Sequence, residues 1–165
     1  MKKFLLIVFA IATCIQLAAQ TSPSQPAYLR YPIIPQFTLL TADSGTITKN
    51  DLKKNRNTLF MYFSPTCDHC QVQTDSMVAE MSKLKDVQIL MATYSPISEM
   101  KTFYEERALS KYGNILMGYD SKYFFPPFYK MSSLPFMALY DKKGNFITSF
   151  HGNTSINKIV EAFER

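Results

Sequence analysis

The stretch TLFMYFSPTCDHC, at residues 58–70, limits what this chain can fold into more than any other part of it. Residues 58–63 are mostly apolar and prone to β-structure, so they predict a buried strand, and the Ser-Pro-Thr sequence that follows predicts a turn. If Cys67 opens a helix, Cys70 lies one turn further along the same face, because residues three apart are neighbours on a helix surface. Two cysteines placed in this way either close a tight disulfide or stand as adjacent thiols.

A helix start also favours reactivity at the first cysteine. Backbone N–H groups at that end lack helical partners, and the helix dipole is positive there. Both features stabilise a thiolate relative to a thiol at Cys67. The order of strand, turn and Cys-x-x-Cys at a helix start therefore indicates redox chemistry.

The amino-terminal end predicts a secretory signal. Two lysines precede an apolar run at residues 4–19, which is short for a membrane span and ends in small residues. An uncleaved anchor is the alternative interpretation, and a lipid anchor at Cys14 is a weaker one, because Thr13 fits poorly before a modified cysteine. We therefore expect a signal peptide at residues 1–19, a flexible leader at residues 20–30 and one domain at residues 31–165 of a periplasmic protein, with no stable membrane insertion after cleavage.

Removal of that signal changes the cysteine count. Three cysteines become two, Cys67 and Cys70, in a compartment where disulfides persist. The bond between them closes too small a loop to stabilise a fold, because stabilisation by a crosslink grows with loop length. The pair is therefore predicted to be functional rather than structural.

The charge pattern gives no sign of a nucleic-acid-binding protein. The chain has 18 Lys and Arg against 13 Asp and Glu, and loss of Lys2 and Lys3 with the signal lowers the net charge from +5 to about +3. The lysines are scattered, with the pairs at 53–54 and 142–143 in predicted loops. We interpret them as a solubilising surface and expect no nucleic-acid partner.

Local patterns predict the remaining helices and strands. A hairpin is expected from residues 37–39 and 46–48 around the turn at 43–45, and a brief helical turn at 50–52 leads to the central strand. After the cysteines we expect a helix at 71–84, a strand buried on both faces and so parallel at 87–94, a helix capped by Ser98 and ending near 110, a strand at 136–140 with its hairpin partner at 145–150, and a helix at 156–163 capped by residues 153–155.

Residues 111–133 show no regular pattern. Aromatic residues crowd into the segment 119–129 beside Pro126 and Pro127. This segment is interpreted as a packed connector, because most aromatic clusters fill a core. A partly exposed aromatic surface for a partner protein is the alternative.

Three spaced features, taken together, resemble the thioredoxin superfamily, most closely its extracytoplasmic TlpA-like branch. They are the FMYFSPTCDHC segment, the SLPF segment that contains Pro135, and the DKKGNFITSFHG hairpin with glycines at 144 and 152. The opening PQFTL at residues 35–39, followed by Gly45, is similar to the hairpin that this branch adds at its N-terminus. The resemblance covers the chain from about Pro35 to its C-terminus.

This resemblance implies an α/β protein with a thioredoxin-like fold, in which helices flank a central mixed β-sheet that carries an added N-terminal β-hairpin. It implies that Cys67 is the attacking cysteine and Cys70 the buried resolving one. Pro135 falls where the family has a cis-proline packed against the disulfide, and Leu134 offers its backbone to a bound peptide. The chain departs from the reducing cytoplasmic thioredoxins at Met61, where they carry a buried Asp, and it contains no Trp.

The activity implied is thiol–disulfide exchange with protein thiols and disulfides as partners. For the TlpA-like branch a reductive role, for example in cytochrome maturation, is the leading expectation, with a membrane electron donor as a further partner. We expect a monomer and no bound cofactor, because the electrons of the reaction reside in the two sulfurs.

The two residues between the cysteines are expected to tune the pair in opposite senses. His69, when protonated or donating a hydrogen bond, stabilises the Cys67 thiolate and makes the disulfide more oxidising. Asp68 brings a negative charge close to the same thiolate and opposes that effect. His69 also resembles the histidine of the strongly oxidising DsbA-type proteins, whereas Asp68 does not, so we expect an intermediate reduction potential.

Three other functions fit the sequence less well. A metal site would join Cys67, His69 and Cys70 to His151, but the crowded Cys-x-His-Cys spacing suits tetrahedral geometry poorly, so no metal ligand is expected. A peroxidase site needs Pro and Thr at a wider spacing before the cysteine than residues 64–66 supply. A binding module that holds a partner through residues 119–129, with the cysteines tolerated or redox-sensing, is the main alternative.

Overall fold

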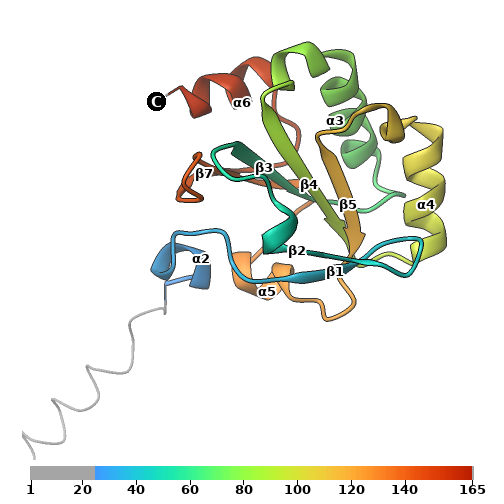
Figure 1. The fold of residues 1–165 in the computed structure, drawn as a ribbon, viewed down its shortest axis with the longest axis horizontal. Helices are drawn as coiled ribbons and strands as arrows, with labels where there is room; N and C mark the ends of the chain where they lie inside the picture. The colour runs from blue at the N-terminus through green and yellow to red at the C-terminus, as the bar shows by residue number, and fades with distance from the viewer. Residues whose placement is uncertain (1–24, 165) are drawn as a thin grey trace, which may run out of the picture.

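A seven-stranded mixed sheet runs through residues 25–164, the part of the chain that the computed structural model describes (Figure 1). Its strands lie side by side in the order β2-β1-β5-β4-β3-β6-β7. Their bounds are Thr38–Leu40 for β1, Thr46–Thr48 for β2, Asn57–Tyr62 for β3, Val87–Thr93 for β4, Ile115–Tyr119 for β5, Phe136–Tyr140 for β6 and Phe146–His151 for β7. The expected signal peptide at residues 1–19 lies outside the described residues, and no helix among those described is long and apolar enough to cross a membrane.

Strand β3 occupies the middle of this sheet. It pairs in parallel with β4 on one side and antiparallel with β6 on the other, with Tyr62 opposite Phe136 at its end. Every residue of β4 is buried, and so is every residue of β3 after Asn57. Strands covered on both faces read as continuous apolar runs, so the predicted central strand and the predicted parallel strand after it are confirmed.

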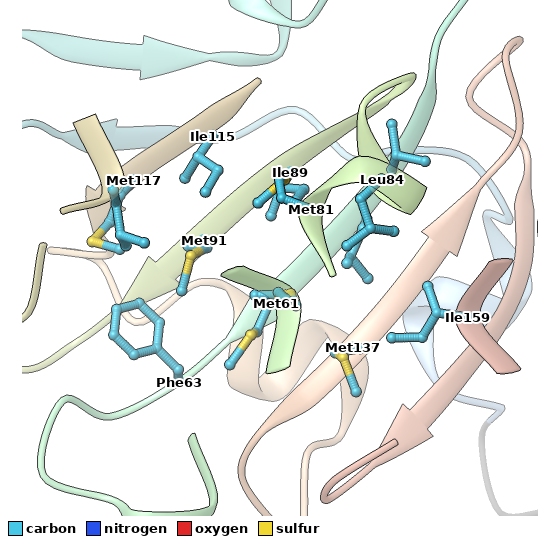
Figure 2. Close-up of a cluster of buried hydrophobic side chains, with 14 of the residues drawn as sticks. Met61, Phe63, Met81, Leu84, Ile89, Met91, Ile115, Met117, Met137 and Ile159 are labelled. Carbon is cyan, nitrogen blue, oxygen red and sulfur yellow. The ribbon is translucent and has the colours of Figure 1, made fainter. Parts of the chain in front are cut away.

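Helices cover the two faces of the sheet and enclose two different cores. Figure 1 shows α3 (Asp68–Ala79), α4 (Ile97–Glu106) and α6 (Ile156–Phe163) on one face, and α2 (Ala27–Arg30) and α5 (Phe125–Tyr129) on the other. The core under α3 and α6 is rich in methionine, with Met61, Met91, Met117 and Met137 pointing from four strands into it (Figure 2). The core under α5 is rich in aromatic rings.

Two helices differ from their predicted bounds. The helix after the cysteines ends at Ala79 and continues, after Glu80, as the short 3₁₀ helix η2 (Met81–Leu84). Helix α4 begins directly after Pro96, so Ser98 lies inside it and does not cap it. The other short 3₁₀ helices are η1 (Lys49–Asp51), which confirms the predicted helical turn, and η3 (Leu109–Lys111).

Strand β5 was not predicted, because residues 111–133 show no strand pattern in the sequence. It lies parallel to β4 and meets β1 antiparallel where Tyr119 faces Leu40. Gly118 lies in this strand, and a glycine inside a strand often marks a close approach of another backbone. A Cβ atom at Gly118 would lie 2.6 Å from Cβ of Leu39 and 3.2 Å from the Leu40 carbonyl oxygen. The glycine therefore allows the N-terminal hairpin to join the sheet, and the same glycine weakens the strand pattern in the sequence.

The aromatic segment that follows β5 is mainly a packed connector, as predicted. Phe125 and Tyr129 are buried, and both rings pack against Phe60 of β3, with ring centroids 4.5 and 5.2 Å away. Asp120, itself buried, accepts hydrogen bonds from the backbone N–H groups of Phe124 and Phe125 and from the hydroxyl of Tyr62 in β3. These bonds join the start of α5 to the central strand.

Helix α2 lies within the segment predicted to be a flexible leader, so the packed domain extends further toward the N-terminus than Tyr31. The ring of Tyr28 contacts the rings of Tyr129 and Phe146, at centroid distances of 5.5 and 5.2 Å. Both contacts of Tyr28 are with residues more than 100 positions away in the chain, so a local sequence pattern does not reveal them.

Replacement of Gly118 by alanine tests the contact between β5 and the N-terminal hairpin. The added methyl group meets the Leu39 side chain at its fixed Cβ atom, so Gly118→Ala is expected to lower the free energy of unfolding by about 1–3 kcal/mol. Gly113→Ala is the matched control, because a Cβ atom there has no neighbour within 4 Å. Denaturant unfolding of both variants checks this, and an equal stability of the two would contradict it.

Candidate functional site

The turn between β3 and α3 positions Cys67 at the start of a helix. Cys67 is the N-cap residue of α3, and its backbone N–H donates to the Ser64 carbonyl at 3.2 Å. The side-chain amide of Gln71 donates from Nε2 to the Pro65 carbonyl at 2.9 Å. This bond joins the loop before α3 to the first turn of the helix. Cys67 is half-buried and Cys70 is fully buried, both as free thiols. The predicted helix start is thereby confirmed, with one sulfur at the surface and one beneath it.

Burial controls the chemistry of Cys70. It belongs to the methionine-rich core together with Met61, Phe63 and Met77. This apolar environment raises the pKa of the Cys70 thiol to about 12, because a thiolate there would lose its hydration. A hydrogen bond from the Ser64 backbone opposes the rise, whereas the hydrogen bond that the Cys70 thiol makes with Cys67 adds to it.

The cis-proline loop lies at the same end of the sheet. The peptide bond between Leu134 and Pro135 is cis, and β6 begins at the next residue. Since Phe136 pairs with Tyr62, the loop lies across from the end of β3 that leads into the cysteine turn. Leu134 and Cys67 both pack at the edge of the same core.

Leu134 keeps its backbone available in this loop. The Pro135 carbonyl accepts a hydrogen bond from the Gly152 N–H at 2.8 Å. Within residues 25–164, by contrast, the N–H and C=O groups of Leu134 have no hydrogen-bond partner outside regular secondary structure. A backbone donor and acceptor of this kind can pair with an extended peptide.

His69 turns toward the loop after β7. Its Nδ1 lies 3.0 Å from Oδ1 of Asn153, and Nδ2 of Asn153 donates to the His69 carbonyl at 2.8 Å. A carbonyl oxygen only accepts, so the second bond fixes the orientation of the Asn153 amide. The first bond then requires that Nδ1 of His69 carries a hydrogen.

A second pair of hydrogen bonds lies beside the first. Gln73, buried in α3, donates from Nε2 to the Thr154 carbonyl at 3.1 Å and accepts at Oε1 from the Thr154 N–H at 2.7 Å. Asn153 and Gln73 were not identified from the sequence, because each pair joins residues more than 80 positions apart. We call these four residues, His69, Asn153, Gln73 and Thr154, the α3 clamp.

The other charged residues near the pair do not assemble into a metal site. Asp68 is exposed in the first turn of α3, where its negative charge interacts favourably with the positive end of the helix dipole. His151 lies on β7 with its ring edge-on to Phe136. Within the described part of the chain, no three His, Cys, Asp or Glu side chains lie close enough together to hold a metal ion.

An aromatic groove borders the cis-proline loop on the other face of the sheet. Tyr94 and Tyr123 are about half exposed, at 50% and 53%, and meet edge to face with centroids 5.4 Å apart. Tyr94 also stacks over Tyr62 at 6.3 Å. Together with Met131 and Leu134 they line a hollow of about 190 Å³. Exposed aromatic rings thus flank the loop that faces the cysteines.

Comparison with solved structures finds the same fold in several thiol–disulfide oxidoreductases. A secreted disulfide oxidoreductase of Mycobacterium tuberculosis, homologous to Escherichia coli DsbE, matches 78% of this chain and 95% of its own, with a TM-score of 0.65 and 16% identity. StoA of Bacillus subtilis matches over 79% and 98%, with a TM-score of 0.60 and 14% identity. The thioredoxin domain of a Bacteroides vulgatus thiol-disulfide oxidoreductase matches 81% of this chain and 96% of its own, with a TM-score of 0.63 and 18% identity.

Sequence comparison gives the family. No curated protein matches the chain significantly. The model of the AhpC/TSA family matches residues 33–158, from the approach to β1 as far as α6. Because this match spans far more than half of the chain, and the structure agrees with it, the protein belongs to the AhpC/TSA family and has the thioredoxin-like fold that these oxidoreductases share.

Proposed function

We propose that the protein exchanges a Cys67–Cys70 disulfide or dithiol with protein substrates outside the cytoplasm. One observation carries this proposal: a half-buried cysteine at the N-terminus of α3 lies above a fully buried one. The first is accessible to a substrate sulfur, and the second is accessible only to the first. The free backbone of Leu134 across from them supports binding of an extended peptide beside Cys67.

In the reductive direction the reaction has two exchange steps. The Cys67 thiolate attacks one sulfur of a substrate disulfide, forms a mixed disulfide and releases the other substrate sulfur as a thiolate. Cys70 then loses its proton and attacks the Cys67 sulfur. The Cys67–Cys70 disulfide forms, the second substrate thiolate leaves, and two electrons have passed to the substrate. Oxidation of a substrate dithiol follows the same steps in reverse.

The proton on Cys70 sets the difficulty of the second step. Met61 lies in the core where reducing thioredoxins carry a carboxyl group, and the apolar environment keeps the pKa of Cys70 at about 12. The first substrate thiolate to leave, or water, takes this proton. When the leaving substrate thiolate takes the proton, resolution is coupled to the formation of the mixed disulfide.

The proposed reductive direction and location rest on similarity to other proteins rather than on the geometry. The TlpA-like fold and the secreted Mycobacterium tuberculosis oxidoreductase support a reductive protein in the periplasm, fed by a membrane electron donor. A bound cofactor is not required for this chemistry, because the two sulfurs hold the electrons.

A binding module remains the second candidate function. The aromatic groove supports it, because Tyr94 and Tyr123 leave half of their surfaces exposed beside Leu134. Within segment 119–129, however, Phe125 and Tyr129 are buried in the aromatic-rich core, and Phe124 and Phe128 pack against it. Replacement of both cysteines with serine separates the two functions: an exchange catalyst loses all turnover, whereas a binding module keeps its partner.

Substitution of the buried cysteine is expected to trap the substrate. In Cys70→Ser the mixed disulfide on Cys67 has no resolving thiol, so covalent complexes accumulate that a reductant releases. Cys67→Ser is the matched control and is expected to form none, because Cys70 is fully buried. Non-reducing electrophoresis after incubation with an oxidised protein substrate checks this. Equal trapping by both variants would contradict the assigned order of attack.

The two thiols are expected to differ in their reaction with iodoacetamide. In the reduced, folded protein at pH 7, Cys67 is alkylated and Cys70 is protected, since the thiolate is the reacting form and the Cys70 pKa is about 12. The rate at Cys70 is expected to rise about tenfold per pH unit above pH 8, until the pH reaches that pKa. Unfolding in guanidinium removes the burial and makes both sites react. Peptide mass spectrometry measures the two rates, and equal rates in the folded protein at pH 7 would refute the prediction.

The reduction potential tests the roles of the residues between the cysteines. Equilibration against glutathione buffers is expected to give a value between about −270 and −120 mV. His69→Leu is expected to shift the potential downward by tens of millivolts, and Asp68→Asn upward, where about 30 mV corresponds to 1.4 kcal/mol. Shifts in the same direction would show that these two side chains do not tune the Cys67 thiolate by charge.

A further inference from the structure

Lysines that are scattered in the sequence gather around one hollow of the structure. The hollow has a volume of about 570 Å³ and lies between the loop before β3 and the turn between β6 and β7. Six of the chain's 18 lysines and arginines line it: Lys49, Lys53, Lys54, Arg56, Lys142 and Lys143. We call it the basic hollow. The two lysine pairs interpreted above as separate solubilising charges therefore face the same space.

The basic hollow lies at the opposite end of the sheet from the cysteines. It is lined by residues that precede or begin β3 and β4 and by the turn that follows β6, whereas Cys67 follows the end of β3. The six residues of β3 separate the two sites by roughly 20 Å. A ligand in the hollow thus leaves the cysteine pair free, and the hollow does not depend on the proposed exchange reaction.

Buried hydrogen bonds hold one wall of the hollow in place. Gln88, on β4 and almost fully buried, accepts from the Lys53 N–H at 2.7 Å and donates to the Lys53 carbonyl at 3.1 Å. Its Nε2 also donates to Thr58 of β3 at 2.8 Å. These bonds fix the backbone that carries Lys53 and Lys54, while both side chains are exposed.

The opposite wall is the β6–β7 turn, which is ordered by Asp141. Its carboxylate accepts from the backbone N–H groups of Lys143 and Asn145, both at 2.8 Å, and from the Asn145 side chain at 2.9 Å. The oxygens of this carboxylate are thus occupied by their own turn. Gly144 adopts a positive φ of 82° there and donates its own N–H to Asp141, which gives the turn its tight form.

The positive charges of the hollow lack acidic partners. Among residues 25–164, every ion pair lies elsewhere, on α3, α4 or η2 and the residues beside them. Lys49 donates to the Ile34 carbonyl at 2.6 Å, so its charge also stays uncompensated. Asp141 is the single acidic residue of the lining. Six cations against one anion around a single hollow create a strongly positive local potential.

We propose that the basic hollow binds a phosphate-bearing anion, either a soluble phosphate ester or a lipid headgroup. Five of its six cations are lysines, which bind phosphate as point charges rather than by the planar fork with which arginine binds carboxylates. A phosphate group carries up to two negative charges on a compact set of acceptor oxygens, which suits several ammonium groups converging from two walls. The side-chain amides of Asn50 and Asn55, which also line the hollow, supply further donors.

Titration with inorganic pyrophosphate, followed by ¹H–¹⁵N NMR of the whole protein, tests the site. We expect the largest shifts at backbone amides of the two walls, such as Lys53, Asn55 and Gly144. In the variant Lys53→Gln, Lys54→Gln, Lys142→Gln, Lys143→Gln, binding is expected to weaken roughly tenfold or more, because four nearby charges are lost. All four side chains are exposed, so the thermal unfolding of this variant is expected to stay unchanged.

A control variant separates the hollow from net charge. Lys111→Gln, Lys122→Gln, Lys130→Gln, Lys158→Gln removes the same charge from lysines outside the lining, and is expected to bind pyrophosphate as the unchanged protein does. Equal weakening in both variants, or shifts spread over the whole surface, would overturn the proposal. A short poly-glutamate peptide that binds the same amides as tightly as pyrophosphate would also overturn it, in favour of an acidic protein partner.

Vesicles distinguish the two sources of phosphate. The measured quantity is the preference for phosphatidylglycerol over phosphatidylcholine vesicles, compared between the hollow variant and the control variant. A preference lost only in the hollow variant identifies a lipid headgroup. No preference, together with specific pyrophosphate binding, identifies a soluble phosphate ester. Absence of both kinds of binding would refute the site.

Discussion

Burial of β3 on both faces is the constraint on which the rest of this structure depends. Its backbone is bonded to β4 and β6, and its side chains enter both cores, so the strand has no freedom to shift its register. The turn after it therefore delivers Cys67 to one fixed point. Because β6 runs antiparallel to β3, the same pairing brings the Leu134–Pro135 loop to that point from the other side.

The difference between the two sulfurs also originates in this core. An apolar environment stabilises the fold by roughly 25 cal/mol for each Å² of apolar surface that it buries, and it disfavours any charge placed within it. Cys67, at the helix start, borders the core, whereas Cys70, one turn later, lies inside it. In this apolar core, which includes Met61, burial raises the pKa of the Cys70 thiol to about 12, so the thiol stays protonated at neutral pH. Packing that holds the sheet together thus also determines which of the two sulfurs is accessible from the surface.

Local patterns predicted most elements, because each has a signal within a few residues. The apolar run of β3, the turn at 43–45 of the N-terminal hairpin and the capping serine of α6 at Ser155 are of this kind. Strand β5 was not predicted, because Gly118 interrupts a short apolar run. A glycine is needed there because the backbone lies close to Leu39, which is far away in the sequence. The residues of the site also divide into those with a local sequence signal and those without one. The two cysteines and the cis-proline carry local signals, whereas the α3 clamp and the basic hollow exist only once the chain has folded.

The α3 clamp shows how the chain after the sheet stabilises the reactive helix start. Four hydrogen bonds, each contributing about 1 kcal/mol, join the first two turns of α3 to Asn153 and Thr154. The residue after them, Ser155, caps α6, so one short loop fixes the starts of two helices. The same bonds hold the His69 ring with Nε2 free of the clamp. The loop after β7 therefore fixes the orientation of the His69 ring at the start of α3.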